Sequence, residues 1–334
     1  MSFHKSGPRH PLSRRTVLAG SAAFAAPFIL GQAAHAQGQY PQKPINLIVT
    51  FAAGGGVDTV SRLFAEALGT GLSGRMVVEN RAGGGTMIGT QAVTTADPDG
   101  YMLLAAPTTM VINPAVKPSM PYDWQKDLVP IGLMAKLPFV AVTRPNSPLQ
   151  SIKDILPLSR SKPEPLSYAS GGTGTVAHLA GELFALRTGA KMQHVPYRGE
   201  GPAVIDVQGG ALDLTFSTLA AVAGQIEGKQ LRALGVTTSE RADLLPDVPT
   251  IQEQGVSPFD VSAWVALMAP ARTPAPALTR LKAALDQALG DRGLKEKLAK
   301  IGAIAAPAVF DTSVFMKREA DTWAQVIRDA KLSF

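Results

Sequence analysis

The sequence predicts an α/β protein made of two domains, the first of them discontinuous. A strand, a glycine-rich loop and a helix follow one another over residues 45–68, and the same order returns over residues 166–184. Strands and helices alternate within each half of the chain, which is typical of parallel sheets covered by helices. An apolar strand at residues 260–269 would then return the chain to the first domain. We expect the first domain to hold residues 37–142 and 265–334, and the second to hold residues 143–264.

The first glycine loop has the features of an anion site. A short apolar run ends at Phe51, and Gly54, Gly55 and Gly56 then leave the backbone open to close approach. The next helix has an apolar stripe at helical spacing, and Asp58 is expected to accept hydrogen bonds from its first free N–H groups. A helix N-terminus beside such a loop favours a bound anion. The alternative is an ordinary βα turn that only packs a helix on a sheet.

The second glycine loop, residues 170–175, repeats this arrangement with hydroxyl groups. Two such loops, one in each half of the chain, indicate two jaws around one anion. The hydroxyls of Thr173 and Thr175 could donate to a ligand or could cap the helix that follows. His178 lies in the first turn of that helix, where it would either fasten the loop or face the ligand.

The remaining elements follow from apolar periodicity and from turn signals. We expect strands at residues 75–79, 101–105, 139–144, 192–196, 212–216 and 231–237. We expect helices at residues 86–95, 220–226, 275–289, 293–301 and 312–331. Two more helices should start near Ser151 and at Pro202.

Four polar residues next to these elements are further site candidates. Thr108 and Thr109 follow a strand end, where open α/β sheets present ligand groups, although turn hydroxyls often only cap local backbone. Tyr197 also follows a strand and would reach the cleft. Asp206 is expected to orient loop N–H groups, because a carboxylate in direct contact would repel an anion.

The first 36 residues have the pattern of an export signal. They combine a twin-arginine motif at Arg14 and Arg15, an apolar segment at residues 17–30, and the small-residue cleavage pattern Ala34-His35-Ala36. We expect a soluble mature chain that begins near Gln37 and is located in the periplasm.

Composition narrows the possible functions. The expected signal holds four of the 32 basic residues and none of the 26 acidic ones, so 28 basic residues remain in the mature chain. That near balance, without a basic tract interleaved with aromatics, gives no support for nucleic acid as a partner. The absence of cysteine excludes disulfides, thiolate nucleophiles and thiolate metal sites. We expect a monomer without metal or cofactor.

Collinear motifs along nearly the whole mature chain resemble those of one family. They include FAAGGGVD at 51–58, VVENRAGGG at 77–85, ADPDGYMLL at 96–104, YASGGTGTVAHLAGELF at 168–184, HVPYRGEGPA at 194–203 and LPDVPTIQEQG at 245–255. On these motifs the sequence is similar to the Bug family, the periplasmic solute receptors of tripartite tricarboxylate transporters.

The resemblance implies a Venus-flytrap fold, of the type II-like periplasmic-binding-protein kind, that closes on a small organic carboxylate and delivers it to membrane permease subunits. It implies that loop N–H groups, hydroxyls and waters hold the ligand in the cleft between the domains. The matching positions are Phe51, Ala53, Gly54, Gly55, Gly56 and Asp58 in the first domain, and Ser170, Gly172, Thr173, Thr175 and His178 in the second.

Three alternatives remain open at this stage. An exported nucleotide-dependent oxidoreductase would also place a glycine loop after a strand, but residues 54–56 lack the G-x-G-x-x-G spacing. A metal or Ser–His–Asp enzyme has few candidate groups, because His178 and His194 are the only histidines after the expected signal. A ligand-binding sensor subunit for a membrane kinase would share the fold and differ only in its partner.

Overall fold

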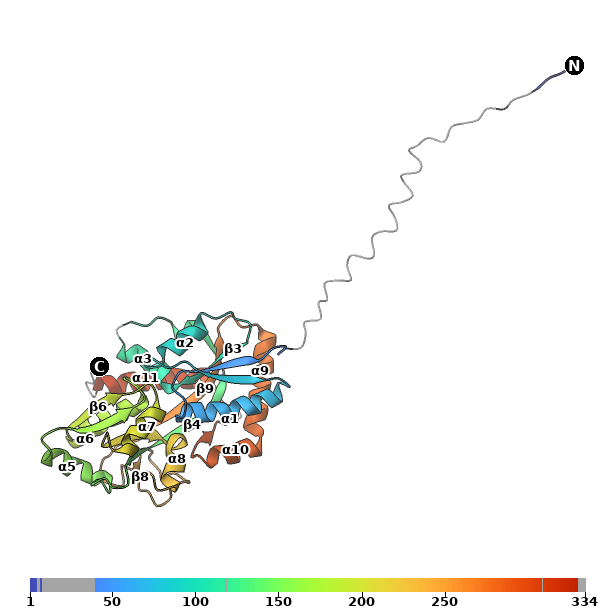
Figure 1. Cartoon of the computed structure of the whole chain (residues 1–334). Coiled ribbons are helices and arrows are strands. Elements are labelled where there is room, and N and C mark those ends of the chain that lie inside the picture. The colour runs from blue at the N-terminus through green and yellow to red at the C-terminus, as the bar shows by residue number, and fades with distance from the viewer. Residues whose placement is uncertain (5–6, 8–39, 118, 308, 330–334) are drawn as a thin grey trace. The chain divides into compact units, whose positions relative to one another are not determined.

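The computed structural model describes residues 1–4, 7, 40–117, 119–307 and 309–329. The chain divides into two compact units, Met1–Tyr40 and Pro41–Phe334. The expected export signal lies almost entirely outside the described residues and stays a prediction. The second unit contains the helices and strands labelled in Figure 1.

The first lobe begins with the alternating strands and helices that the sequence predicts. Its elements are β1 (Ile45–Val49), α1 (Gly56–Gly71), β2 (Met76–Asn80), α2 (Met87–Thr94), β3 (Met102–Pro107) and α3 (Thr108–Val116). β1 lies between β2 and β3 and pairs with both in parallel. The stripe of α1 packs on this sheet, and Val60, Phe64 and Leu68 are completely buried.

The second lobe repeats this architecture. It contains η1 (Ile152–Asp154), α5 (Ile155–Ser161), β5 (Leu166–Ser170), α6 (Val176–Thr188), β6 (Met192–Pro196), α7 (Glu200–Gly209), β7 (Leu214–Thr218), α8 (Leu219–Glu227) and β8 (Arg232–Val236). β5 pairs in parallel with β6 and β7.

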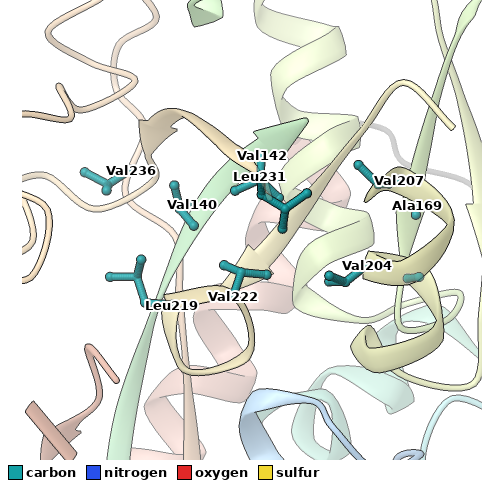
Figure 2. Close-up of a cluster of buried hydrophobic side chains, with 10 residues drawn as sticks. Val140, Val142, Ala169, Val204, Val207, Leu219, Val222, Leu231 and Val236 are labelled. Atoms are coloured by element: carbon teal, nitrogen blue, oxygen red, sulfur yellow. The ribbon is translucent and has the colours of Figure 1, made fainter. Parts of the chain in front are cut away.

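One apolar cluster of the second lobe fixes the two helices that matter for the site. Val204 and Val207 of α7 and Leu219 and Val222 of α8 belong to the same buried cluster as Val140 (Figure 2). Apolar packing therefore holds in place Glu200, the first residue of α7, and Thr218, the residue before α8.

Two long strands connect the lobes. β4 (Leu128–Thr143) pairs with β9 (Ser262–Pro270) up to Pro138, and with β7 and β8 from Phe139 onward. The strand order is β2-β1-β3-β9-β4-β7-β5-β6, and β8 and β10 (Ile304–Ala305) also pair with β4. β9 is antiparallel to β3 and β4. β4 takes the chain out of the first lobe, and β9 brings it back.

The three predicted C-terminal helices are present and pack on helices of the first lobe. α9 (Ala275–Gly290) packs on α1, α10 (Arg292–Ala299) also contacts α1, and α11 (Thr312–Asp329) packs on α3. The short α4 (Trp124–Asp127) precedes β4. The domain boundaries expected from the sequence stay a prediction.

Three local predictions were wrong. β4 begins at Leu128 instead of Phe139, because its two prolines do not interrupt the strand. Pro130 lies at a register shift, and Pro138 pairs near one end of β9. A strand tolerates a missing N–H donor at both kinds of position. α7 begins at Glu200, two residues before Pro202. Gly55 is the N-cap of α1, so Asp58 lies inside the helix.

Candidate functional site

A cavity of about 40 Å³ lies between the two lobes and is lined from both sides. Its first-lobe lining comes from the β1–α1 loop and the start of α3, and its second-lobe lining from the β5–α6 loop and the starts of α6, α7 and α8. The lining residues are Phe51, Gly55, Gly56, Val57, Pro107, Thr108, Thr109, Phe139, Gly171, Thr175, Val176, Ala177, Glu200, Thr218 and Ala263.

Several helices point their N-termini at this cavity. Gly55, Pro107, Thr175 and Thr218 are the N-caps of α1, α3, α6 and α8, and all four line it. The first N–H groups of a helix have no acceptor within the helix, and the aligned peptide dipoles add partial positive charge there. None of the described lining residues is Lys, Arg or His. The cavity can therefore hold an anion by backbone dipoles without a cationic side chain.

The carboxylate of Glu200 already occupies part of this electropositive surface. Its Oε2 accepts hydrogen bonds from the Gly56 N–H (3.0 Å) and the Thr218 hydroxyl (2.7 Å), and its Oε1 accepts from the Thr218 N–H (3.1 Å). Burial raises the pKa of the Glu200 carboxyl, while these three hydrogen bonds act in the opposite direction. Glu200 thus joins the second lobe to the N-terminus of a first-lobe helix.

The four hydroxyls that line the cavity differ in their partners. Thr108 Oγ1 accepts from the Trp264 N–H at 2.7 Å, and Thr175 Oγ1 donates to the Gly172 carbonyl at 2.7 Å. Thr218 bonds Glu200. Thr109 is 3% exposed, and its hydroxyl makes no hydrogen bond with another residue in the described part of the chain. Thr109 is therefore the lining hydroxyl that remains available to a ligand.

Asp58 supports the first loop from behind. It does not line the cavity; it accepts from the Gly54 N–H (3.0 Å), from Asn80 Nδ2 (2.9 Å) and from Arg62 through Nε and Nη2. Burial raises the pKa of Asp58, but the hydrogen bonds from Arg62, Asn80 and Gly54 outweigh it, so the pKa lies below its ordinary value of 3.8. Asp58 holds the loop in shape and leaves Gly56 to face the second lobe.

A buried polar network supports the second loop. The Ser170 hydroxyl bonds the Gly172 carbonyl and lies 2.6 Å from His194 Nε2. The Gly174 N–H donates to His178 Nδ1 at 3.0 Å, and the rings of His178 and His194 stack with centroids 3.6 Å apart. Ser170 is 1% exposed and does not line the cavity, so this Ser–His contact shapes the loop and presents no nucleophile to a ligand.

Arg198 and Tyr197 lie at a second hollow beside the cavity. This hollow shares Phe51 and Gly171 with the cavity and also includes the glycine loop at residues 83–85. The Tyr197 hydroxyl donates to Asp206 Oδ2. Burial, which is the larger cause, and this carboxylate together raise the pKa of Tyr197 to about 12. The Arg198 carbonyl accepts from the Ala52 N–H at 2.9 Å, which is a second direct bond between the lobes.

The chain matches the family described as "Tripartite tricarboxylate transporter family receptor" over residues 60–332. It belongs to this receptor family. It is 37% identical to Protein BugT of Bordetella pertussis over 293 residues, which cover 87% of this chain and 90% of that protein. It is 37% identical over 308 residues to a protein from the TAR-I ttuE-ttuC' intergenic region of Agrobacterium vitis, covering 90% and 88% of the two chains.

Solved structures of similar proteins show the same two-domain fold. The periplasmic binding protein BugD superposes with a TM-score of 0.83 at 31% identity, covering 88% of this receptor and 99% of BugD. The Rpa4515 protein of R. palustris, solved with adipate, gives a TM-score of 0.84 at 30% identity over 88% and 99% of the two chains. The α/β binding-protein fold and the family predicted from the sequence are thus confirmed.

The structure brings together five of the residues predicted for the site. Phe51, Gly55, Gly56, Thr108 and Thr175 line the cavity, and Tyr197 lines the neighbouring hollow. The other predicted residues do not line either space: Ala53, Gly54, Asp58, Ser170, Gly172, Thr173, His178 and Asp206. Asp206 accepts the Tyr197 hydroxyl in place of the expected loop N–H groups.

Glu200 and Thr218 line the cavity but were not among the residues predicted from the sequence. Glu200 lies just before the helix predicted to start at Pro202, and an acidic residue next to a predicted helix is a known signal of an N-terminus. Thr218 follows the predicted strand at residues 212–216 and precedes a predicted helix, which is a typical N-cap position.

The described part of the chain contains neither a metal-binding cluster nor a membrane-spanning helix. No group of three or more His, Cys, Asp or Glu side chains among them is arranged to hold a metal ion. None of the helices in the described ranges is long and apolar enough to cross a membrane.

Proposed function

We propose that this receptor captures a small organic carboxylate between its lobes in the periplasm, acts as a monomer without catalysis, and delivers the ligand to its membrane permease. The observation that carries the proposal is the cavity lined by four helix N-termini from both lobes and by no cationic side chain. Pre-aimed N–H groups give a carboxylate charge-assisted hydrogen bonds that a neutral ligand would not receive.

The solved relatives support the same ligand class. Rpa4515 is described with adipate, and the MatC protein of Rhodopseudomonas palustris, 28% identical with a TM-score of 0.81, with bound malate. Both ligands are carboxylates, and both proteins share the fold that forms the cavity here. A nucleotide-dependent oxidoreductase finds no comparable support.

A ligand screen by thermal shift tests the proposal. The mature chain is unfolded and refolded to remove bound ligand and is then heated with a panel of mono-, di- and tricarboxylates, with NAD and NADP as controls. A ligand at one hundred times its Kd adds about 2.7 kcal/mol of stability, which raises Tm by about 5 °C in a chain of this size. A shift with nucleotides alone would contradict the proposal.

A sensor subunit would give the same ligand profile, so the partner needs its own measurement. Ligand-dependent binding of the purified receptor to its permease in nanodiscs is expected, and a complex formed only with a membrane kinase would favour the sensor.

A further inference from the structure

Glu200 presents its carboxyl group to the ligand cavity at the starts of two helices, where the helix dipoles favour negative charge. Its three hydrogen bonds come from the Gly56 N–H and from the N–H and hydroxyl of Thr218. None of these donors is a cationic side chain, and Glu200 makes no ion pair with the residues that the structure describes. The Glu200 carboxyl group therefore has only neutral hydrogen-bond partners among the described residues.

Close packing on both sides keeps Glu200 in this position. The glycine before it, Gly199, and the glycine after it, Gly201, lie against the first loop, where a Cβ would meet Ala52 N at 2.9 Å and Ala53 O at 2.4 Å. The apolar cluster of α7 anchors the helix that Glu200 begins (Figure 2). A side chain held by backbone contacts and by a buried core does not easily leave when a ligand arrives.

The polar groups that line the cavity are of two kinds. Glu200 accepts from the Gly56 N–H at the start of α1 and from Thr218 before α8, whereas the starts of α3 and α6 and the hydroxyl of Thr109 have no carboxylate partner among the described residues. The lining also includes the apolar side chains of Phe51, Val57, Phe139 and Ala263. One ligand carboxylate would find N–H donors at the starts of α3 and α6. A second carboxylate near the starts of α1 and α8 would meet Glu200.

We infer that Glu200 determines the ligand class: the receptor selects monocarboxylates with an apolar body and rejects dicarboxylates. This inference rests on the proposed function, since it concerns the same cavity. Glu200 acts as a specificity residue through like-charge repulsion, which is an unfavourable interaction built against the wrong ligand. It also accepts from the Gly56 N–H, a donor at the start of α1 that a second ligand carboxylate would need.

Matched acid pairs test the inference. Binding of hexanoate and adipate, and of butanoate and succinate, is measured by calorimetry to the full mature chain, so that length is constant within each pair. The wild-type receptor is expected to bind the monocarboxylate of at least one pair at least tenfold more tightly than its dicarboxylate. This measurement needs no variant and is made first.

The variant Glu200→Gln removes the charge and keeps the size of the side chain. It is expected to reduce the monocarboxylate preference at least tenfold, mainly through tighter dicarboxylate binding. The exposed Glu164→Gln in the same lobe is the control and should keep the wild-type ratio. Should Glu200→Gln not fold, Glu200→Ala with its smaller side chain is used for the same ratio.

The outcomes separate the inference from the proposed function. Equal or tighter dicarboxylate binding by the wild-type receptor overturns the inference and leaves carboxylate binding intact. A monocarboxylate preference that survives Glu200→Gln overturns the role of Glu200 alone. If no carboxylate of these pairs or of the thermal-shift panel binds, the proposed function fails and the inference fails with it.

Discussion

A Cβ atom on Gly56 would lie 2.1 Å from the hydroxyl oxygen of Thr218. Gly56 begins α1 in the first lobe, and Thr218 caps α8 in the second, so this contact limits how closely the lobes approach. Glycine is needed here for space and not for an unusual backbone angle, since its φ is not positive. The same contact places the Gly56 N–H against the Glu200 carboxylate.

We predict that Gly56→Ala keeps the fold but prevents full closure. Alanine is at least as favourable as glycine inside a helix, so each lobe should remain stable. The added methyl group should weaken binding of the best carboxylate at least tenfold in calorimetry. Gly224→Ala, where a Cβ would meet nothing within 4 Å, is the control and should bind normally. Wild-type affinity in Gly56→Ala would contradict this account of closure.

Thr108 and Thr109 should separate stability from binding. Thr108 is fully buried and bonds the Trp264 backbone, so Thr108→Val leaves that N–H unpaired and should lower the free energy of unfolding by about 1–3 kcal/mol. Thr109→Val removes a hydroxyl without a protein partner; it should leave the unliganded protein nearly unchanged and reduce carboxylate affinity about tenfold. Urea unfolding and calorimetry on both variants check this, and the reverse pattern would refute it.

Asp58 should stabilise the first loop in a manner that depends on pH. Asp58→Asn is expected to cost about 2 kcal/mol at pH 7, because the carboxylate loses charge-assisted bonds from Arg62 and the Gly54 N–H. The folded pKa is lowered, so this stabilisation is present above the unfolded pKa of 3.8 and is lost as pH falls through the folded value.

The measurement is the unfolding free energy of both proteins from pH 7 down to pH 3. Asp286→Asn, which removes an exposed ion pair with Lys282, is the control and should change stability by less than about 1 kcal/mol. A difference between wild type and Asp58→Asn that grows on acidification would be incompatible with a lowered pKa.

His194 should destabilise the second lobe in mild acid. Burial and the neighbouring His178 lower the pKa of His194 from 6.5 to about 4, while Glu182 acts in the opposite direction. Between pH 6.5 and pH 4 the unfolded chain therefore binds more protons than the folded chain. The free energy of unfolding falls as the pH drops through this range. Because His194 is only partly buried, solvent screening reduces the full cost to about 1–2 kcal/mol.

The variant His194→Gln retains a polar group near Ser170 but does not titrate. Unfolding at pH 7 and pH 4.5 should show a smaller acid destabilisation for the variant than for the wild type. His4 belongs to the first unit, Met1–Tyr40, so His4→Gln in a chain that keeps its N-terminus is the control and should keep the wild-type acid sensitivity. An equal acid sensitivity in wild type and His194→Gln would exclude the proposed titration.

The sequence by itself determined the local elements and the family. Apolar periodicity and glycine loops depend on neighbouring residues, so β1, α1, β5 and α6 were predicted within a few residues of their observed bounds. The paired loops also predicted an anion site between two lobes, and several of their residues line the observed cavity. The collinear motifs led to the receptor family that the comparisons show.

Only the tertiary structure decided which groups face the cavity. The bond from Gly56 to Glu200 joins residues 144 positions apart, and the bond from Thr108 to Trp264 joins residues 156 positions apart. No local pattern specifies such partners, because they depend on how two lobes and two crossing strands pack. For the same reason Asp58 and His178, predicted for the site, support the loops from behind, while Glu200 lies inside the cavity.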